Sequence, residues 1–187
     1  MAMADESVDG HVLFGDDSEL RTQVLDVYLP HCRYLKTAAL RAAAAPGDPA
    51  ALTVTGEFEI GDSCYIKGTG HFNAVEFNIC YNQLAYYLIA KAVKERLLQV
   101  LGDWDLDEFW RRQLPNLLIA DFRSTFKREI RHKRFFGSIT ITTVRKLEKN
   151  VSRGPIVILY TVCQFWDETV GSCRGEVKIA ITDPVAR

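Results

Sequence analysis

The polar residues with the clearest capacity for chemistry gather in one stretch, from Gly61 to Tyr87. Packing alone would not require so many polar side chains there. Gly68 and Gly70 allow the backbone to turn tightly and to approach a ligand, and His71 and Asn73 stand at the start of a long apolar helical run. The unpaired N–H groups at such a helix start favour anions. The stretch therefore predicts a site that stabilises an oxygen gaining negative charge, such as a thioester carbonyl.

Several of these residues also have structural explanations. Asn73 and His71 could simply cap the helix, as Asn at a helix start commonly does. Glu76 is either a carboxylate base or an acid favoured by the helix dipole, and Tyr65 could be an ordinary strand aromatic. Asn82 is harder to explain by packing, because a buried amide without a partner costs about 1–3 kcal/mol. We therefore expect Asn82 to meet a partner or a ligand.

A long helix must position this site. The span from Phe72 to Leu101 contains no Pro or Gly and is followed by Gly102, which predicts one continuous helix. Its first five turns are apolar in nearly every direction, as is typical of a helix buried on most sides. Only the charged residues of the last turns are expected to face solvent: Lys91, Lys94, Glu95 and Arg96.

The remaining elements are mostly strands. A short amphipathic helix begins at Ser18 and ends near Pro30, and a second short helix surrounds residues 105–113. Residues 1–17 have little to bury and are expected to be loose, ahead of a single domain over residues 18–187. The strand predictions are a hairpin over residues 34–42 and 51–61, then an antiparallel meander of four runs near residues 117–126, 135–148, 155–168 and 175–183. These elements predict an α+β fold whose sheet wraps the long helix.

The string YIKGTGHFNAVEFNICYNQLAYY, together with CRYL at residues 32–35, resembles the FcoT-like (type III) long-chain fatty acyl-CoA thioesterase family. The resemblance extends from the first helix to QFWDETVGSCRGEVKIA near the C-terminus. It implies a hot-dog fold, in which a curved antiparallel sheet wraps a long central helix. It also implies that the motif residues surround the thioester of a bound acyl chain, where they hydrogen-bond or transfer protons: Tyr28, Tyr65, His71, Asn73 and Asn82.

The chain is also similar to the (2E)-enoyl-[acyl-carrier-protein] glycyltransferase branch of isonitrile lipopeptide and β-amino acid pathways. Such enzymes add glycine to C3 of an enoyl thioester and free an N-(carboxymethyl)-3-amino acid. Asn78 favours this branch, because the thioesterase pattern has an apolar residue there. Asn78 and Asn82 share a helix face, so their amides, beside Gly70 and Glu76, could hold a small polar co-substrate. Lys67 and Arg33 are candidates for binding the glycine carboxylate.

Two other functions remain open at this point. One is a plain long-chain fatty acyl-CoA thioesterase, and the other is a non-catalytic acyl-binding hot-dog protein. The thioester substrate of a glycyltransferase or a thioesterase would arrive on coenzyme A or on an acyl carrier protein, and both carriers present a phosphate. The run KREIRHKR could dock that phosphate, or it could be a solvated strand end and turn. Its cations are Lys127, Arg128, Arg131, Lys133 and Arg134.

Composition narrows the choice of partners. The formal net charge of -1 argues against nucleic-acid binding driven by the overall charge of the protein. No apolar run approaches the roughly 20 residues of a membrane helix, and the acidic start lacks the apolar region of a secretory signal. Five cysteines without paired spacing indicate reduced thiols, and no spacing supports a metal. We expect a cytoplasmic enzyme without a metal or cofactor, which buries its sheet edge in a homodimer or larger homo-oligomer.

Overall fold

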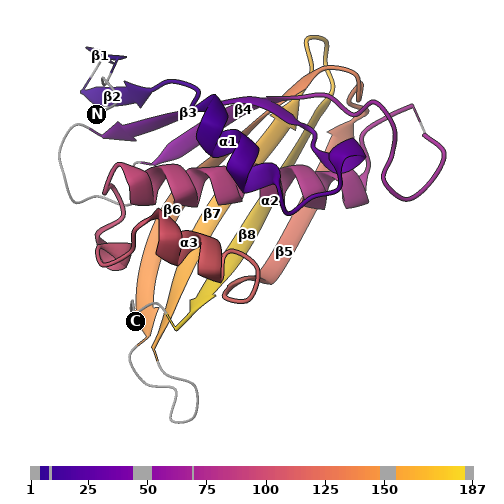
Figure 1. The fold of residues 1–187 in the computed structure, drawn as a ribbon. Helices are drawn as coiled ribbons and strands as arrows, with labels where there is room; N and C mark the ends of the chain where they lie inside the picture. Colours follow the sequence, from indigo (N-terminus) through magenta and orange to yellow (C-terminus); the bar gives the residue numbers. More distant parts are fainter. Residues whose placement is uncertain (1–4, 9, 44–51, 69, 148–154, 184–187) are drawn as a thin grey trace.

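The computed structural model describes residues 5–8, 10–43, 52–68, 70–147 and 155–183. This part of the chain forms one antiparallel sheet in the strand order β1-β2-β3-β4-β6-β7-β8-β5. The strands are β1 (Asp5–Val8), β2 (His11–Phe14), β3 (Leu35–Ala43), β4 (Thr53–Phe58), β5 (Leu117–Arg128), β6 (Phe135–Leu147), β7 (Ile156–Trp166) and β8 (Ser172–Thr182). The helices are α1 (Ser18–Leu25), α2 (Ala74–Lys94) and α3 (Leu106–Arg112), with short 3-10 turns η1 (Pro30–Cys32) and η3 (Gln99–Leu101). The long helix α2 lies across the sheet (Figure 1), so the predicted α+β hot-dog fold is confirmed.

Helix α2 is shorter than the sequence predicts. It begins where expected, but it ends at Lys94 instead of Leu101. At its end Leu97 N–H donates to the Ala92 carbonyl and Arg96 N–H to the Val93 carbonyl, while Arg96 has a φ of 56°. This pattern is a Schellman motif, which usually places Gly at the left-handed position. Because Arg occupies it here, the sequence carries no stop signal at this point.

The burial of α2 agrees with its apolar pattern, with one exception. Phe77, Leu84 and Leu88 are enclosed on the faces toward the sheet. Lys91 was expected to be solvated, but its side chain is only 4% exposed and its Nζ lies 3.0 Å from Glu95 and 3.4 Å from Asp17. The prediction for Lys91 is therefore wrong, because a buried ammonium is tolerated when carboxylates face it.

Glycines in three strands allow the core aromatics to approach the sheet. Gly56 pairs with Gly137 across β4 and β6, and Gly175 lies in β8. A Cβ at Gly137 would lie 2.5 Å from the Phe165 ring, and one at Gly175 would lie 2.8 Å from the Phe77 ring. The Phe77 and Phe165 rings pack with centroids 4.9 Å apart. The missing side chains thus make room for the aromatic cluster beneath the start of α2.

The strand order differs from the predicted meander. Strands β6, β7 and β8 do follow one another as neighbours, but β5 pairs with β8 and not with β6. Strand β5 therefore forms one edge of the sheet, and the chain crosses from that edge to reach β6. Sequence periodicity identifies the strands but cannot state which of them pair, because pairing depends on long-range register.

The N-terminal segment is more ordered than expected. Residues His11–Phe14 form β2, which pairs with β3 from His11 opposite Ala43 to Phe14 opposite Leu40. Helix α1 begins at Ser18 as expected, and Asp17 caps it, because the Asp17 carboxylate accepts from Leu20 N–H. The same carboxylate lies 2.6 Å from Lys94 Nζ. Asp17 thus ties the start of the ordered chain to α2. No helix of the described ranges has the length and apolar character that crossing a membrane requires.

Candidate active site at the start of helix α2

The loop between β4 and α2 is fixed against the turn between β5 and β6. Phe72 N–H donates to the Ile130 carbonyl at 3.0 Å, and Ile60 N–H donates to the His132 carbonyl at 2.9 Å. Between them, the backbone of His71 forms a bridge with Arg131. Gly70 has a φ of 85°, a conformation that favours glycine. The predicted turn at Gly70 therefore exists, and it brings His71 beside the basic run.

Asn73 starts α2 with a capping box. Its Oδ1 accepts from Val75 N–H at 3.0 Å and from Glu76 N–H at 3.3 Å, while the Glu76 carboxylate accepts from Asn73 N–H at 3.3 Å. The capping explanation is therefore confirmed for Asn73, and Glu76 is buried as part of the box. Two of the helix N–H groups expected to bind an anion are thus occupied by the cap.

One polar group of Asn73 takes no part in the capping box. The Asn73 Nδ2 group is buried and has no hydrogen-bond partner among the described residues. Its orientation is set because Oδ1 already receives two N–H groups. A buried donor without a partner is uncommon in proteins and calls for an explanation. Capping and ligand binding are thus compatible for Asn73, with one side of the amide available for each.

Asn78 and Asn82 meet on α2 as their spacing predicts. The Asn82 Nδ2 group donates to Asn78 Oδ1 at 2.9 Å, and both side chains are half-buried. Asn82 therefore has the partner that its position demands. The contact uses one donor and one acceptor, and each amide has further hydrogen-bonding capacity. On the same helix face, the Nδ2 group of Asn78 can donate to a ligand and the Oδ1 atom of Asn82 can accept from one.

Tyr28 and Arg33 lie where α1 leads into β3. The Tyr28 and Tyr86 ring centroids are 6.5 Å apart, and burial raises the pKa of Tyr28, so its hydroxyl stays protonated and can donate. Arg33 is already engaged: its Nε donates to the Tyr28 carbonyl at 2.9 Å, and a terminal nitrogen lies 2.9 Å from Asp26. These contacts make Arg33 a support for the turn and a poor candidate for the glycine carboxylate.

Tyr65 and Lys67 lie on the exposed part of the loop. The Tyr65 side chain is 48% exposed, and Lys67 is also exposed. Two hydrogen bonds fix the start of this loop: Tyr34 Oη donates to the Asp62 carbonyl at 3.4 Å, and Lys133 Nζ donates to the Gly61 carbonyl at 3.1 Å. The single chain therefore does not enclose Tyr65, and the catalytic role of Tyr65 stays a prediction.

The basic run is only partly available for docking. Arg134 pairs with Glu57 at 2.7 Å and with Glu168 at 2.6 Å, which raises the pKa of its guanidinium. Lys127 and Arg128 are exposed at the end of β5. Fewer than the five predicted cations are therefore available to dock a phosphate. Arg134 is already paired with carboxylates, and Lys133 binds the Gly61 carbonyl.

Asp167 fixes the backbone of this basic turn. Its Oδ2 accepts from Arg131 N–H at 2.9 Å, and its Oδ1 accepts from the N–H groups of Thr169 and Gly171. Partial burial opposes ionisation, but these hydrogen bonds together lower the pKa of Asp167 to about 2. The carboxylate therefore stays charged at neutral pH and holds Arg131 in place beside His71.

Gln83 is the residue that the sequence reasoning missed. It is fully buried, its Oε1 accepts from Tyr34 N–H and Leu35 N–H at 3.0 Å each, and its Nε2 donates to the Cys32 carbonyl at 2.6 Å. Gln83 thus clamps the CRYL segment to α2, next to Asn82. Its signal was available, because a glutamine in an apolar helix needs buried partners.

Burial makes Cys32 and Cys80 poor nucleophiles. Burial raises the pKa of the Cys80 thiol well above its ordinary value, and burial likewise raises the pKa of Cys32, which contacts Cys64. Thiols with raised pKa values are weak nucleophiles. Within the described ranges, no three His, Cys, Asp or Glu side chains are grouped so that they could hold a metal ion. The polar groups at the start of α2 are amides, tyrosines, one histidine and the Glu76 carboxylate of the capping box.

Residues 23–181 match the FcoT-like thioesterase domain. The chain belongs to this family. A relative named (2E)-enoyl-[ACP] glycyltransferase from Streptomyces coeruleorubidus is 42% identical over 167 residues, which cover 89% of this chain and 98% of the relative. A protein of the same name from Mycobacterium tuberculosis (strain ATCC 25618 / H37Rv) is 35% identical over 165 residues, which cover 87% of this chain and 85% of the relative.

Among solved structures, a variant of a thioesterase from Pseudomonas aeruginosa aligns with 76% of this chain and 81% of its own, at 12% identity and a TM-score of 0.38. The FcoT-like family match includes the whole candidate site, from Tyr28 through Asn82. The resemblance that the sequence motifs indicate is thereby confirmed, whereas the roles of the individual residues stay predictions.

We expect Gln83→Leu to destabilise this FcoT-like protein by about 2–4 kcal/mol, because three buried backbone groups lose their partner at once. Urea unfolding followed by circular dichroism measures the change. Gln23→Leu is the matched control, since Gln23 is exposed on α1 and its replacement should change the free energy of unfolding by less than about 0.5 kcal/mol. An equal effect of both substitutions would contradict the clamp.

Proposed function

We propose that this protein is a (2E)-enoyl-[acyl-carrier-protein] glycyltransferase. It joins the glycine nitrogen to C3 of the enoyl group and then hydrolyses the thioester, which releases a 3-[(carboxymethyl)amino] fatty acid. The observation that carries this proposal is the contact between Asn78 and Asn82 at 2.9 Å, which presents two amides toward the site from the face of α2. The names of the two relatives support the same reaction.

The addition requires three tasks of the site. Glycine must lose a proton from its ammonium before its nitrogen can attack, because the neutral amine is the nucleophile. As the N–C3 bond forms, the C2–C3 π electrons move toward the thioester carbonyl, whose oxygen becomes negative. The resulting enolate then takes a proton at C2. Binding, proton transfer and charge stabilisation must therefore occur within one small volume.

The residues around the α2 start can divide these tasks. Tyr65, assisted by His71, handles the proton in this proposal. The buried Asn73 Nδ2 group, which has no partner among the described residues, stabilises the enolate oxygen. The predicted backbone donors between Gly70 and Asn73 contribute less, because Phe72 N–H already donates to Ile130 and Asn73 N–H to Glu76. Donors fixed before the reaction are effective because they need no reorganisation as charge develops.

The remaining polar groups place the substrates. The amides of Asn78 and Asn82 orient the enoyl group and glycine, and Lys67 attracts the glycine carboxylate. Tyr28 donates from its protonated hydroxyl, since burial raises its pKa. In the second half-reaction, water attacks the thioester carbonyl, the same donors stabilise the tetrahedral oxyanion, and the carrier thiol leaves.

A second copy of the chain completes this site in our proposal. Among the residues that the structure describes, the outer edge of β5 has no strand beside it, and its Leu118 and Phe126 side chains are 45% and 40% exposed. Tyr65 and Val75 near the start of α2 are comparably exposed. Pairing of β5 with its twin would satisfy the free edge and cover apolar surface. The protein is thus proposed as a cytoplasmic homodimer or larger homo-oligomer.

A plain fatty acyl-CoA thioesterase is the second candidate, because the domain match is to a thioesterase family. Its hydrolysis would use the same oxyanion donors but would need no pocket for glycine. Purified protein should be given enoyl and saturated thioesters on both carriers, with and without glycine, and the products identified by mass spectrometry. Release of free enoyl acid with no glycine adduct at any glycine concentration would favour the thioesterase.

The amide pair gives the first prediction for this function. Asn78→Leu should suppress the glycine adduct by about 10-fold or more, while glycine-independent hydrolysis changes much less, because only the addition needs a polar second-substrate pocket. Mass spectrometry of both products in one reaction measures the ratio. Asn78→Gln is the control, since it retains an amide. Formation of the adduct at the wild-type rate by the Leu variant would refute the role of Asn78.

The proton-handling group and the second amide give another prediction. Tyr65→Phe and Asn82→Ala should each lower kcat by about 10-fold or more while the fold stays intact, as expected for groups acting in the transition state. Steady-state rates measure the loss, and circular dichroism checks the fold. Tyr160→Phe is a suitable control, because Tyr160 lies in β7 under the cations of Arg145 and Lys178. Wild-type rates in both site variants would remove them from the mechanism.

The shared sheet edge predicts the oligomeric state. At micromolar concentration the wild type should sediment at twice the 21.2 kDa of the chain or more. Leu118→Asp should shift it toward the single chain, because the substitution would bury a charge at the contact. Leu147→Asp is the control, since Leu147 is 50% exposed at the far end of β6. A wild type found only as the 21.2 kDa species would contradict the shared edge.

A further inference from the structure

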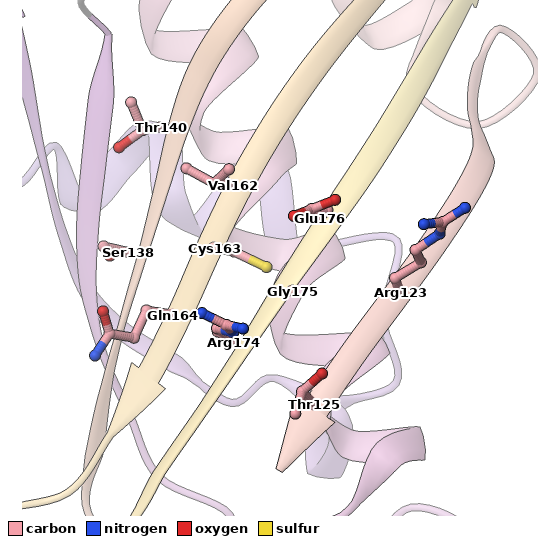
Figure 2. A pocket seen from close by; sticks show the side chains of 10 residues that line it. All are labelled: Arg123, Thr125, Ser138, Thr140, Val162, Cys163, Gln164, Arg174, Gly175 and Glu176. Atoms are coloured by element: carbon pink, nitrogen blue, oxygen red, sulfur yellow. The ribbon is translucent and has the colours of Figure 1, made fainter. Parts of the chain in front are cut away.

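A cavity of about 550 Å³ lies on the face of the sheet that points away from α2. Its wall comes from β5, β6, β7 and β8, and Figure 2 shows the side chains that line it over these strands. Arg174 and Glu176 are exposed there, whereas Cys173 and Val177 on either side of them in β8 are buried toward the helix. This cavity is separate from the candidate active site at the start of α2.

The register of the strands places two arginines together in this cavity. Arg174 pairs with Thr125 of β5 and with Gln164 of β7, and Glu176 pairs with Arg123. Arg123 and Arg174 are therefore diagonal neighbours on one face, within reach of the same ligand. The lining also includes the polar side chains of Thr125, Ser138 and Gln164.

These two arginines differ from other cations on the same face. Lys178 pairs with Asp121 at 2.8 Å, and Arg134 pairs with Glu57 and Glu168. In the described part of the chain, neither Arg123 nor Arg174 has a carboxylate within salt-bridge distance. The charged side chains that line the cavity are Arg123, Arg174 and Glu176, so the lining carries an excess of positive charge.

The positive surface continues toward the active site. The next outward pair beyond Arg174 and Thr125 is Ser172 with Arg128, which is about 7 Å further along the strand. Arg128 belongs to the exposed start of the basic run, and the backbone of Arg131 in the same run pairs with that of His71. The end of β5 thus connects the arginine-lined cavity, through the backbone of the basic run, with the segment that leads into α2.

We propose that the cavity docks the acyl carrier protein through an acidic segment of that carrier. Arg123 and Arg174 receive its carboxylates, and the phosphate of its pantetheine arm passes Arg128 and Arg131 on the way to the thioester site. This inference rests on the proposed function, because it takes the substrate to be carrier-bound. Complementary charge of this kind speeds and orients association more than it tightens a complex, which suits a carrier that must leave after each turnover.

Single exposed ion pairs contribute little, so the test needs both arginines. The Arg123→Ala/Arg174→Ala variant should raise KM for the enoyl-carrier substrate by about 10-fold and reduce the dependence of that KM on salt. Its kcat/KM for enoyl-pantetheine, which lacks the carrier protein, should stay at the wild-type value. Arg145→Ala is the matched control, because Arg145 lies over the Tyr160 ring on the same face but outside the cavity. Circular dichroism checks that each variant is folded.

Several outcomes would overturn the docking surface. One is a wild-type KM for the enoyl-carrier substrate in the double variant, and another is an equal loss on enoyl-pantetheine. A changed sedimentation profile would instead identify the face as a contact between copies of the chain. Binding of the carrier without an acyl group, followed by fluorescence anisotropy, tests docking without the chemistry. If the wild type binds this carrier through the two arginines but makes no glycine adduct, the proposed function fails and the docking surface stands.

Discussion

The burial of α2 on nearly every side is the constraint on which the rest of the structure depends. A helix without a solvated stripe is stable only where a sheet curls around it, and each large side chain that it encloses contributes about 1.5–3 kcal/mol. The glycines at Gly56, Gly137 and Gly175 let the aromatic cluster approach the strands closely. The curvature of the sheet and the place where α2 begins are therefore determined together.

The same burial decides which polar residues of α2 are free to act. A polar group enclosed by the core is costly unless it is paired, so Gln83 binds the backbone of the CRYL segment and Tyr81 binds Thr161 at 2.7 Å. Asn78 and Asn82 lie on the half-buried face and bind each other. They are the amides of this helix whose remaining groups face outward from the core, which is why the chemistry concentrates at this face.

The sequence predicts the local structure well where period and capping decide it. The contact of Asn78 with Asn82 followed from helical spacing, and the cap at Asn73 from its residue type. The end of α2 was missed because Arg96 occupies a left-handed position that usually contains glycine. Lys91 was placed in solvent because Asp17, one of its two carboxylate partners, belongs to a distant segment. The local pattern of residue types along the sequence does not show which distant segments come into contact.

The proposed docking surface also depends on a contact between distant strands that the sequence pattern does not show. Arg123 and Arg174 are far apart in the sequence, and they meet only because β5 pairs with β8. In the meander that periodicity suggested, β5 would lie beside β6, and Arg123 would face a different neighbour. The basic run at residues 127–134 is easily recognised in the sequence. In the fold, however, its Arg134 forms ion pairs with Glu57 and Glu168. Cations therefore have to be judged by their partners in the fold, and on that basis Arg123 and Arg174 on the sheet are available to a ligand, whereas Arg134 of the run is not.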